Sequence, residues 1–480
     1  MISSTEMAVV DENAAALGVP RKQLMESSGN AVARVVREVA DPGASVALIC
    51  GRGNNGGDAF VAARFLDGYD VTVHLLGRRG TITTDIAREN WDALRSAGVD
   101  TRRVGDSRSL ELGDPDVVVD AMLGTGVTGA LREPEATAAG AIDDADATVV
   151  AVDVPSGIDA DTGDSEGPAV EADRVVTFHD DKPGLASLDA DVTVADIGIP
   201  AAAERFVGPG DLLGLDRDPD SHKGDAGEVL VVGGGPYAGA PALAGRAALR
   251  AGADLVRVAC PASVADAVQG YSENLILRPF DGERFAPRDV DAVLDTAARH
   301  DAVVIGPGLG GHHGTRSAVQ DFLARYDGTV VVDADALSLV PDVDTDATLV
   351  CTPHQGELRG MGGETAAGWR ARAELVAEFA AELGHVLLVK GPYDVVSDGA
   401  ETRVNRTGNP GMTVGGTGDV LAGVTGALAC VLPPLQAASV AAYATGRAGD
   451  DAAKTAGDGL LATDLPDRLP AAVRDAEGEE

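Results

Sequence analysis

The stretch GRGNNGGDAF, residues 51–60, follows the apolar run ASVALIC, residues 44–50, and leads into a helical pattern of apolar residues. A β-branched apolar run, a glycine-rich turn and a helix together indicate an α/β fold. Gly51, Gly53 and Gly56 have the spacing G-x-G-x-x-G, which between a strand and a helix is typical of a turn that holds the pyrophosphate of a dinucleotide. The stretch therefore predicts a dinucleotide ligand and leaves open whether that ligand serves as a cofactor.

A dehydrogenase built on this turn carries an acidic residue about 20 positions later, at the end of its second strand. Leu76 and Gly77 occupy that place, so the expected ribose-binding acid is missing. Arg78 and Arg79 follow and would suit a 2′-phosphate. The hydride-transfer interpretation is weakened by the missing acid but stays open.

Short apolar runs alternate with alanine-rich helical segments through both halves of the 480-residue chain. The strands predicted in the first half are residues 45–50, 70–76, 115–123, 147–154, 173–179 and 191–199. Those predicted in the second half are residues 228–235, 254–261, 301–310, 329–337, 348–356 and 385–396. This alternation predicts parallel pairing, two doubly wound α/β/α domains, and sites at the carboxyl ends of the strands. A Gly-, Pro- and Asp-rich stretch at 208–227 is the predicted linker, which gives domains at 1–212 and 215–480.

The chain carries 76 acidic and 38 basic side chains, a formal net charge of −38. The acids are spread through apolar-patterned sequence, which argues against a disordered acidic tail as their source. Such a surface suits a salt-rich, halophile-like cytoplasm, where the Debye length shrinks to about 3 Å. It also argues against a nucleic-acid partner, which would meet a surface of like charge. Only five of the basic residues are lysines, Lys22, Lys182, Lys223, Lys390 and Lys454, so each is a candidate for a specific role.

The beginning of the sequence has neither a basic nor an apolar targeting region, and no apolar run reaches the ~20 residues of a membrane span. The four cysteines are widely spaced and form no C-x-x-C. These features predict a cytoplasmic protein with reduced, buried thiols.

Polar residues follow three predicted strands of the first half. Asn54 and Asn55 offer amide groups, Gly56 and Gly57 would let the backbone approach a ligand, and Asp58 would either contact that ligand or cap the next helix.

The stretch VVVDAMLGTGVTGAL puts Asp120 before a Gly-Thr-Gly loop suited to phosphate, and DVPSGIDADTG supplies Asp153 and Ser156. Asn55, Asp120 and Ser156 offer only oxygen ligands, so a hard cation is favoured over a transition metal.

These stretches, with FHDDKPG at 178–184, resemble the NAD(P)H-hydrate epimerases over about residues 1–212. That family binds a damaged dinucleotide, hydrated at C6 of the nicotinamide ring, and interconverts its R and S forms. The resemblance implies K⁺ at Asn55, Asp120 and Ser156, acid–base work by Asp153, and Lys182 as its partner, the alternative being a surface lysine. It implies substrate contacts at Asn54, Asn55, Gly56, Gly57, Asp58, Gly124, Thr125, Gly126, Val127, Thr128, Gly129, Ala130 and Asp153. Ala59 departs from the family, which more often has glycine there.

The stretch TGNPGMTVGGTGDVLAGVTGAL, residues 407–428, is the sharpest motif of the second half. The small residues from Gly415 to Gly418 leave backbone N–H groups bare at a helix N-terminus, which suits a phosphate. Asp419 follows directly and could take a proton from an attacking hydroxyl. The alternative is a glycine-rich turn in which Asp419 caps the helix.

Further strand ends supply GPGLG at 306–310, DADAL at 333–337, TPHQGE at 352–357 and VKGPYDVV at 389–396. Gly310 is placed to lie against a ligand or forms a plain turn, and Lys390 could meet nucleotide phosphates. The roles of Lys223 and Glu357 stay open.

This set resembles the ADP/ATP-dependent NAD(P)H-hydrate dehydratases of the ribokinase-like superfamily, over about residues 215–470. The family transfers a phosphoryl group to the 6-hydroxyl of the S hydrate, and loss of phosphate then restores NAD(P)H. The resemblance implies Asp419 as the base, Mg²⁺ as charge neutraliser, and hydrate contacts at Ala240, Gly310, His354 and Asp419. It implies nucleotide contacts at Lys390, Gly391, Pro392, Tyr393, Asp394, Gly415, Gly416, Thr417 and Gly418. Asp394 departs from the family, which usually has threonine there, so the donor, ADP or ATP, stays open.

The sequence thus predicts a two-activity repair enzyme for NADH and NADPH hydrates, with small-molecule substrates, no nucleic-acid or membrane partner, and a homo-oligomer as one possibility for its assembly. One alternative is a vitamin or sugar kinase fused to a nucleotide-binding module. Another is a first half that binds ligand without catalysis.

Overall fold

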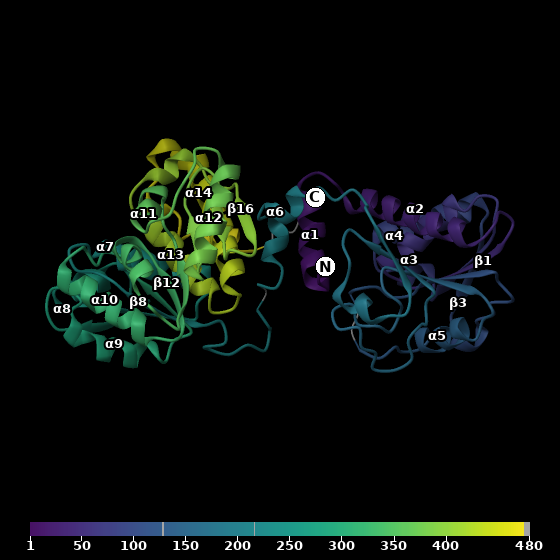
Figure 1. Ribbon diagram of the computed structural model, residues 1–480, viewed down its shortest axis with the longest axis horizontal. Helices are drawn as coiled ribbons and strands as arrows, with labels where there is room; N and C mark the ends of the chain where they lie inside the picture. The colour runs from purple at the N-terminus through teal and green to yellow at the C-terminus, as the bar shows by residue number, and fades with distance from the viewer. Residues whose placement is uncertain (127–128, 216, 475–480) are drawn as a thin grey trace. The chain divides into compact units, whose positions relative to one another are not determined.

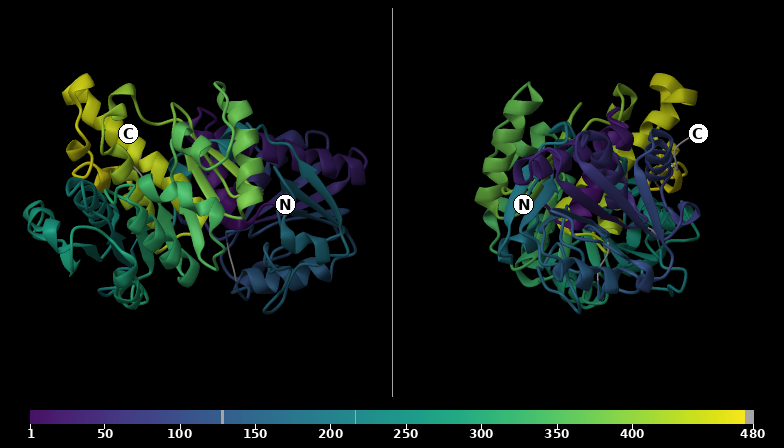
Figure 2. Two further views of the ribbon diagram at one scale, coloured as in Figure 1. Left: turned by 60° about the vertical axis from the view of Figure 1, so that its left-hand side comes forward. Right: turned by 90° about the vertical axis from the view of Figure 1, so that its right-hand side faces the viewer.

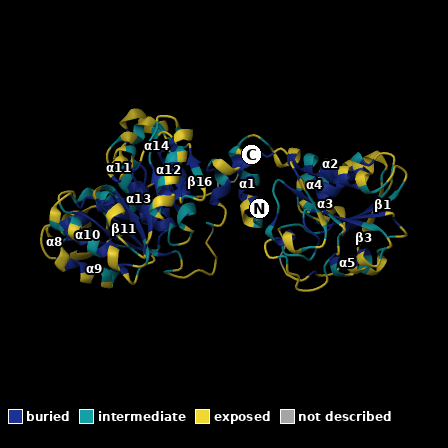
Figure 3. Ribbon diagram, in the orientation of Figure 1, coloured by how far each residue is buried: buried dark blue, intermediate teal, exposed yellow. Residues whose placement is uncertain are grey.

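The computed structural model describes residues 1–126, 129–215 and 217–474, and the chain divides into two compact units, Met1–Ala203 and Glu204–Glu480. Each unit is built around one sheet whose strands are buried between helices (Figures 1 and 3). None of the helices in the described part of the chain combines the length and hydropathy that a membrane-crossing segment requires.

The first unit holds a seven-stranded sheet of order β3-β2-β1-β4-β5-β6-β7, in which every neighbouring pair is parallel. Its strands are β1 (Ser45–Cys50), β2 (Asp70–Leu76), β3 (Asp100–Val104), β4 (Val117–Ala121), β5 (Thr148–Val152), β6 (Arg174–Phe178) and β7 (Asp191–Ala195). Its helices are α1 (Ser4–Ala16), α2 (Arg21–Val39), α3 (Asn54–Phe65), α4 (Asp85–Ala97) and α5 (Glu135–Asp143), and α6 (Ala202–Arg205) lies at the join of the units. The parallel pairing predicted from the alternation is confirmed.

Both faces of this sheet are covered, as Figures 1 and 2 show, with α2, α3 and α4 on one side and α5 on the other. Alternate residues of β1 serve the two layers: Leu48 packs in the core with α2 to α4, and Ile49 packs in the core with α5. This period of two, buried on both sides, is why β1 reads as a continuous apolar run.

The second unit holds a nine-stranded sheet of order β10-β9-β8-β11-β12-β13-β14-β15-β16. Its strands are β8 (Glu228–Val232), β9 (Leu255–Pro261), β10 (Ile276–Phe280), β11 (Ala302–Ile305), β12 (Thr329–Val332), β13 (Thr348–Cys351), β14 (Val386–Val389), β15 (Asp394–Ser397) and β16 (Thr402–Asn405). Helices α7 (Gly239–Ala251), α13 (Thr417–Leu428) and α14 (Pro434–Ala456) share one core, and α9 (Val290–Ala297), α10 (His313–Arg325) and α12 (Trp369–Leu383) share the other. The remaining helices are α8 (Ala262–Gly270), α11 (Gln355–Gly360) and α15 (Leu469–Ala472).

The run 385–396, predicted as one strand, is a hairpin instead. The chain leaves β14 at Val389, turns, and returns as β15, which pairs antiparallel with β14 and with β16. Pro392 has no N–H to donate to a neighbouring strand, and it lies in the turn, where no such hydrogen bond is needed. The hairpin matters for function because its turn contains the predicted nucleotide loop.

The division between the units falls before the predicted linker. Phe206 forms a bridge with Val404 of β16, and the buried carboxylate of Asp211 pairs with Arg403 at 2.7 Å. The first residues of the Gly-, Pro- and Asp-rich stretch are therefore folded onto the sheet of the second unit.

Candidate active sites

The turn between β1 and α3 owes its glycines to packing inside the protein. A Cβ at Gly51 would collide with the carbonyl of Met122, and one at Gly56 would collide with the carbonyl of Gly51. Gly57 is buried, and a Cβ there would lie 2.9 Å from the Met25 sulfur. Packing within the first unit is therefore enough to require glycine at positions 56 and 57, and their contact with a ligand stays a prediction.

Helix α3 nonetheless presents an open N-terminus. Its N-cap is Gly53, which supplies no side-chain hydrogen bond, and the exposed Asn54 follows. The first N–H groups of a helix have no partner within it, and the helix dipole adds partial positive charge there. This end of α3 can therefore accept an anionic group such as a pyrophosphate.

Asp58 lies in the second turn of α3, so it is not the helix cap considered above. It is only 8% exposed, and burial raises its pKa well above the usual value, with further contributions from Asp153 and Asp11. The Asp58 carboxyl therefore interacts electrostatically with Asp153 and Asp11.

The three predicted cation ligands come together around the carbonyl of Leu123. Ser156 donates to both oxygens of Asp120, from N to Oδ2 and from Oγ to Oδ1, each at 2.7 Å. Asn55 Nδ2 donates to Leu123 O at 2.8 Å, which leaves Asn55 Oδ1 as a potential ligand. Burial raises the pKa of Asp120 to about 6, against hydrogen bonds from Ser156 and Met122 that lower it. A buried carboxylate surrounded by neutral oxygens fits a monovalent cation, which would supply the missing positive charge.

Asp153 and Lys182 form the most distinctive pair of the first unit. Lys182, predicted either as a catalytic partner or as a surface residue, is fully buried, and its ammonium lies 3.8 Å from Asp153 Oδ1. The ammonium donates to Phe178 O at 2.9 Å and to Asp180 O at 3.0 Å. Burial lowers the pKa of Lys182, and Asp153 opposes this shift. Asp153 has a φ of +67°, a strained backbone for a residue other than glycine, as is often found at functional sites.

A pocket of about 400 Å³ is lined by residues of the loops after β4 and β5, among them Gly124, Gly129, Ser156 and Asp159. Gly124 lies between the predicted cation ligand Asn55 and the carboxylate of Asp153, because a Cβ there would lie 3.3 Å from both Asn55 Cγ and Asp153 Oδ2.

The structure describes only part of the predicted substrate loop, residues 124–130. Thr125 N donates to Asp153 Oδ2 at 3.4 Å, and Gly126 and Ala130 are exposed. The predicted contacts Val127 and Thr128 lie outside the described residues.

Asp11 of α1 is a residue that the sequence analysis missed. Burial raises its pKa to about 6, and it interacts electrostatically with Arg21, Asp153, His179 and Lys182. Asp11 lies within the helical pattern VVDENAAA, between apolar residues. This unusual setting for an acid was the signal from which its role in the site could have been predicted.

In the second unit, the glycines of the GGTGD motif open the N-terminus of α13. Gly416 is the N-cap, with a φ of +99° and no side-chain hydrogen bond, and the helix begins at Thr417. A Cβ at Gly415 would face open space, in contrast to the buried glycines of the first unit. The N–H groups of Thr417, Gly418 and Asp419 therefore form a potential phosphate site.

Asp419 is the third residue of α13 and not its cap. Burial raises its pKa to about 7, Asp333 raises it further, and Lys390 lowers it. A half-buried carboxylate beside a potential phosphate site, with a pKa near neutrality, has the properties of a general base.

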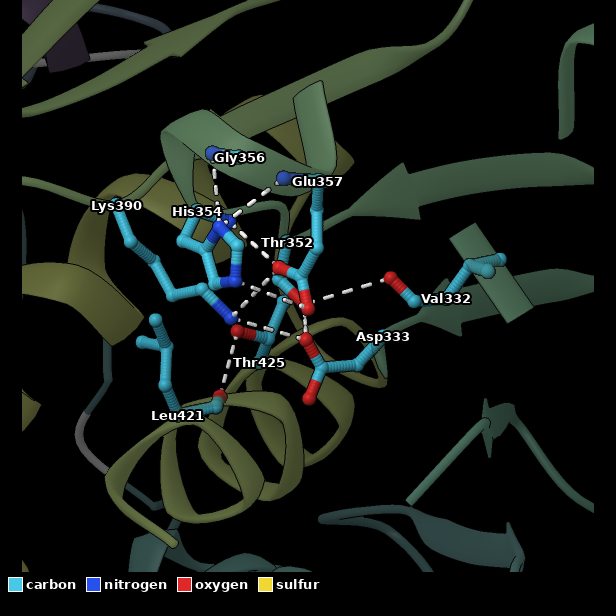
Figure 4. Close-up of polar contacts among 9 residues, drawn as sticks. All are labelled: Val332, Asp333, Thr352, His354, Gly356, Glu357, Lys390, Leu421 and Thr425. Carbon is cyan, nitrogen blue, oxygen red and sulfur yellow. Dashed lines mark hydrogen bonds and ion pairs between the residues drawn. The ribbon is translucent and has the colours of Figure 1, made fainter. Parts of the chain in front are cut away.

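Lys390 lies between Asp333, which follows β12, and Glu357 of α11, as Figure 4 shows. Its ammonium lies 3.1 Å from Asp333 Oδ1 and 3.8 Å from Glu357 Oε2, and Thr352 Oγ1 donates to the same Asp333 oxygen at 2.8 Å. Burial lowers the pKa of Lys390, but the carboxylates of Asp333 and Glu357 outweigh it, so the net shift is upward. A Cβ at Gly418 would lie 3.2 Å from the ammonium, which places this cation at the open end of α13.

His354 caps the short helix α11. Its Nδ1 accepts hydrogen bonds from Gly356 N at 2.9 Å and Glu357 N at 3.0 Å, while its side chain stays 60% exposed. Because Nδ1 is an acceptor, the hydrogen-bond network assigns the proton to Nε2, which lies 3.6 Å from Glu357 Oε1.

The two carboxylates of DADAL have separate roles. Asp333 faces Lys390, whereas Asp335 accepts from Gly310 N at 2.9 Å and so fixes the GPGLG loop. Ala240, near the start of α7, lies against this loop, because a Cβ at Gly308 would be 3.3 Å from it. Lys223 is exposed in the chain segment before β8 and does not join this network.

Asp394 is built into the hairpin turn. Its oxygens accept from Gly391 N and from Asn405 Nδ2, each at 2.9 Å. Burial raises its pKa to about 6, and these hydrogen bonds oppose the shift. Asp394, at which the sequence departs from the family, therefore holds the loop that begins at Lys390.

Both halves of the chain match known protein families. The family model described as YjeF-related protein N-terminus matches residues 21–184, and the model described as NAD(P)H-hydrate dehydratase matches residues 229–471. The chain is 45% identical to a bifunctional NAD(P)H-hydrate repair enzyme of Pyrobaculum aerophilum over 98% of each chain. It is 43% identical to the enzyme of the same name from Methanothermobacter thermautotrophicus, over 98% of this chain and 95% of that one.

A solved structure gives the fold of the larger part of the chain. A ribokinase-like superfamily protein from Enterococcus faecalis superposes with a TM-score of 0.50 and 24% identity, covering 56% of this chain and 95% of the other. At this identity the likeness concerns the fold alone. The matches of both halves and of nearly the full length, taken together, show that the chain belongs to the family of bifunctional NAD(P)H-hydrate repair enzymes.

Proposed function

We propose that this chain repairs hydrated NAD(P)H in two steps, epimerising the R and S hydrates in the first unit and dehydrating the S hydrate in the second. The observation that carries the proposal is the position of Asp419 at the uncapped N-terminus of α13, beside Lys390. A single carboxylate next to a phosphate site and a cation is what activation of a hydroxyl for phosphoryl transfer requires.

In the dehydratase step, Asp419 takes the proton of the 6-hydroxyl of the hydrate. The oxygen of that hydroxyl attacks the terminal phosphorus of ADP, and AMP leaves. With ATP as donor, ADP leaves. The N–H groups at the start of α13 hold the transferred phosphoryl group, and Lys390 offsets its charge. Phosphate then departs from C6 with the loss of a proton from C5, which restores the double bond of NAD(P)H. His354, Ala240 and Gly310 are the residues that we expect to contact the hydrate.

Mg²⁺ is the cation we expect with the nucleotide. Among residues 1–126, 129–215 and 217–474, no group of three or more His, Cys, Asp or Glu side chains forms a metal cage. Mg²⁺ in such enzymes needs only one or two carboxylates, with nucleotide phosphates and water completing its shell. Asp333 and Glu357, which flank Lys390, fit this requirement.

In the epimerase step, Asp153 and Lys182 transfer protons to and from the 6-hydroxyl, so that water leaves C6 and adds again from the other face of the ring, and the N-terminus of α3 receives the pyrophosphate. Asn55, Asp120 and Ser156 would hold K⁺, which supplies positive charge beside the anionic substrate. Asp153 is the group we expect to act at the ring, since its Oδ2 lies at the edge of Gly124 and its Oδ1 faces the ammonium.

The decisive experiment mixes purified protein with the S hydrate and with ADP or ATP, and follows the return of NADH absorbance. Activity is expected with the wild type and is expected to be lost in Asp419→Asn. A wild type that restores no absorbance, or an Asp419→Asn variant that matches it, would refute the dehydratase. Consumption of the R hydrate no faster than its spontaneous epimerisation would refute the epimerase.

A further inference from the structure

Three arginines lie in the two turns that follow β1 and β2 in the first unit. Arg52 belongs to the turn after β1, while Arg78 and Arg79 follow Gly77, the first residue after β2. The two strands are neighbours in the sheet, and a Cβ at Gly77 would lie 3.2 Å from Arg52 Cδ. The side chain of Arg52 therefore runs along the turn that carries the other two arginines.

The three guanidinium groups differ in their acidic partners. Arg79 donates to both oxygens of Asp92 in α4, from Nε at 2.6 Å and from Nη2, so its charge is offset. Arg52 Nη2 lies 3.4 Å from Glu135 Oε1, a single long contact. Arg78 is exposed, and no carboxylate in the part of the chain that the structure describes forms an ion pair with it. The charge of Arg78 is therefore available to an anionic ligand.

The order of the strands indicates which part of a dinucleotide would reach this turn. Asp153, which we expect to act at the nicotinamide ring, follows β5, and the open N-terminus of α3 follows β1. The sheet order is β2-β1-β4-β5, and neighbouring strands lie about 4.8 Å apart, so these two points are separated by roughly 10 Å. A dinucleotide with its nicotinamide at Asp153 and its pyrophosphate at α3 therefore directs its adenosine half toward the end of β2, where Arg78 lies.

The end of the second strand is where dinucleotide-binding sheets distinguish the two forms of the adenosine ribose. An acidic residue there accepts a hydrogen bond from a 2′-hydroxyl, whereas an arginine accommodates a 2′-phosphate. Residues 77–84, GRRGTITT, contain no acid before α4 begins at Asp85. The turn thus supplies a cationic donor for a 2′-phosphate and no carboxylate for a 2′-hydroxyl.

We propose that Arg78, with Arg52 beside it, binds the 2′-phosphate of NADPH hydrate, so that the first unit prefers this hydrate to NADH hydrate. The inference rests on the proposed epimerase, whose preferred substrate it identifies. A guanidinium binds a phosphate through charge-assisted hydrogen bonds, and NADH hydrate has no anionic group at this position. The pyrophosphate, which both hydrates share, is the other phosphate that Arg78 could bind, but the strand order places it at α3, one strand away.

The test measures epimerisation of each purified R hydrate without ADP or ATP, so that the second unit does not consume the S hydrate. Chromatographic separation of the R and S forms gives kcat/KM above the spontaneous rate. We expect the wild type to prefer NADPH hydrate by about tenfold, the usual contribution of one hydrogen bond to a charged group. Arg78→Met removes the charge and keeps a long side chain. This variant is expected to lose the preference through a lower kcat/KM for NADPH hydrate alone.

Arg64→Met is the matched control. Arg64 lies in the last turn of α3, at the end opposite the open N-terminus, and pairs with Glu26, so both hydrates should react as they do with the wild type. Arg78→Asp places an acid at the end of the second strand and is expected to reverse the preference in favour of NADH hydrate. Because Arg78 is exposed, its variants should fold, which circular dichroism verifies.

Inhibition of the epimerase gives a second readout that does not involve the nicotinamide ring. Adenosine 2′,5′-bisphosphate should inhibit the wild type more strongly than AMP, and this difference should vanish in Arg78→Met. A wild type without preference for NADPH hydrate, or the same preference in Arg78→Met, would overturn the proposal. An equal loss for both hydrates in Arg78→Met would also overturn it, and would assign Arg78 to the pyrophosphate.

A wild type that epimerises neither hydrate would refute the proposed epimerase, and calorimetry would then decide on the arginine site. Adenosine 2′,5′-bisphosphate that binds the wild type more tightly than AMP does, and binds Arg78→Met more weakly, would support the site. Equal binding of the bisphosphate by the two proteins would overturn it.

Discussion

The Lys182 ammonium lies 3.8 Å from Asp153 Oδ1 although the lysine side chain is fully buried. Burial of a cation is costly unless a nearby anion and hydrogen bonds offset it, and here Asp153, Phe178 O and Asp180 O do so. A lysine kept in such a place, in a chain with five lysines, indicates a chemical role.

We predict that Lys182→Met lowers R-hydrate consumption by roughly 10²- to 10⁴-fold, the usual contribution of a positioned proton donor or acceptor. The measurement is the rate at which the R hydrate enters the dehydratase reaction. Conversion of the S hydrate by the same protein is an internal control, because it depends on the second unit.

Lys22→Met is the matched control. Lys22 belongs to the same unit but is 58% exposed and pairs with Glu89, so its loss should leave both activities unchanged. Full epimerase activity in Lys182→Met, with the protein folded by circular dichroism, would contradict a role for the pair.

Asp419 should impose a pH dependence on the dehydratase. Its pKa is raised to about 7, chiefly by burial, and a general base must be unprotonated to act. We expect kcat/KM for the S hydrate to rise about tenfold per pH unit below pH 7 and to level off above it. A flat profile between pH 5 and 8 would argue against Asp419 as the base.

The same shift predicts an effect on stability. A carboxyl with a raised pKa binds its proton more tightly in the folded state, so the free energy of unfolding falls as pH rises from about 4 to 7. The asparagine side chain of Asp419→Asn cannot ionise, so the free energy of unfolding of this variant does not fall with pH for this reason. The variant should therefore melt at a higher temperature than the wild type at pH 8, with the difference vanishing near pH 4, even though it is inactive.

Much of the fold could be predicted because most strands are buried on both faces. Strands such as β1 and β11 read as unbroken apolar runs, whereas the edge strands β3 and β10 were missed. Both edge strands are largely solvated and contain charged residues, so they lack the apolar signal. The β14–β15 hairpin was also missed, because its two apolar arms are separated by only a short polar turn.

The site was predicted where neighbouring strand ends carry polar residues. Asp120 lies at the end of β4, Asn55 and Ser156 follow the ends of β1 and β5, and the ends of neighbouring parallel strands meet at one edge of the sheet. Asp11 could not be placed in this way, since only the packing of α1 brings it near Asp153. The reason for Gly56 was equally hidden, because it depends on the carbonyl of Gly51.

Potassium should stabilise the first unit specifically. A cation that binds the folded state alone raises the free energy of unfolding, by about 2.7 kcal/mol at 100 times its Kd. We expect the melting temperature to be higher in KCl than in NaCl at equal ionic strength, and expect Asp120→Asn to remove this difference. Equal melting in the two salts for the wild type would count against the potassium site.

The GRGNNGG turn offers a matched pair of glycines for testing the packing argument. A Cβ at Gly51 would strike the Met122 carbonyl at the end of β4, whereas one at Gly53 would meet nothing within 4 Å. Gly51→Ala must displace backbone and should cost about 1–3 kcal/mol or more, while Gly53→Ala, at a helix N-cap, should cost about 1 kcal/mol or less.

Urea unfolding in a Trp369→Phe background measures both costs. The fluorescence then comes from Trp91, which packs on Phe60 of α3 with ring centroids 5.3 Å apart and so reports the first unit. Gly51→Ala should shift the unfolding midpoint to clearly lower urea than Gly53→Ala does. Equal midpoints for the two variants would mean that the turn can move away from β4, and that ligand binding, not packing, is what requires glycine at position 51.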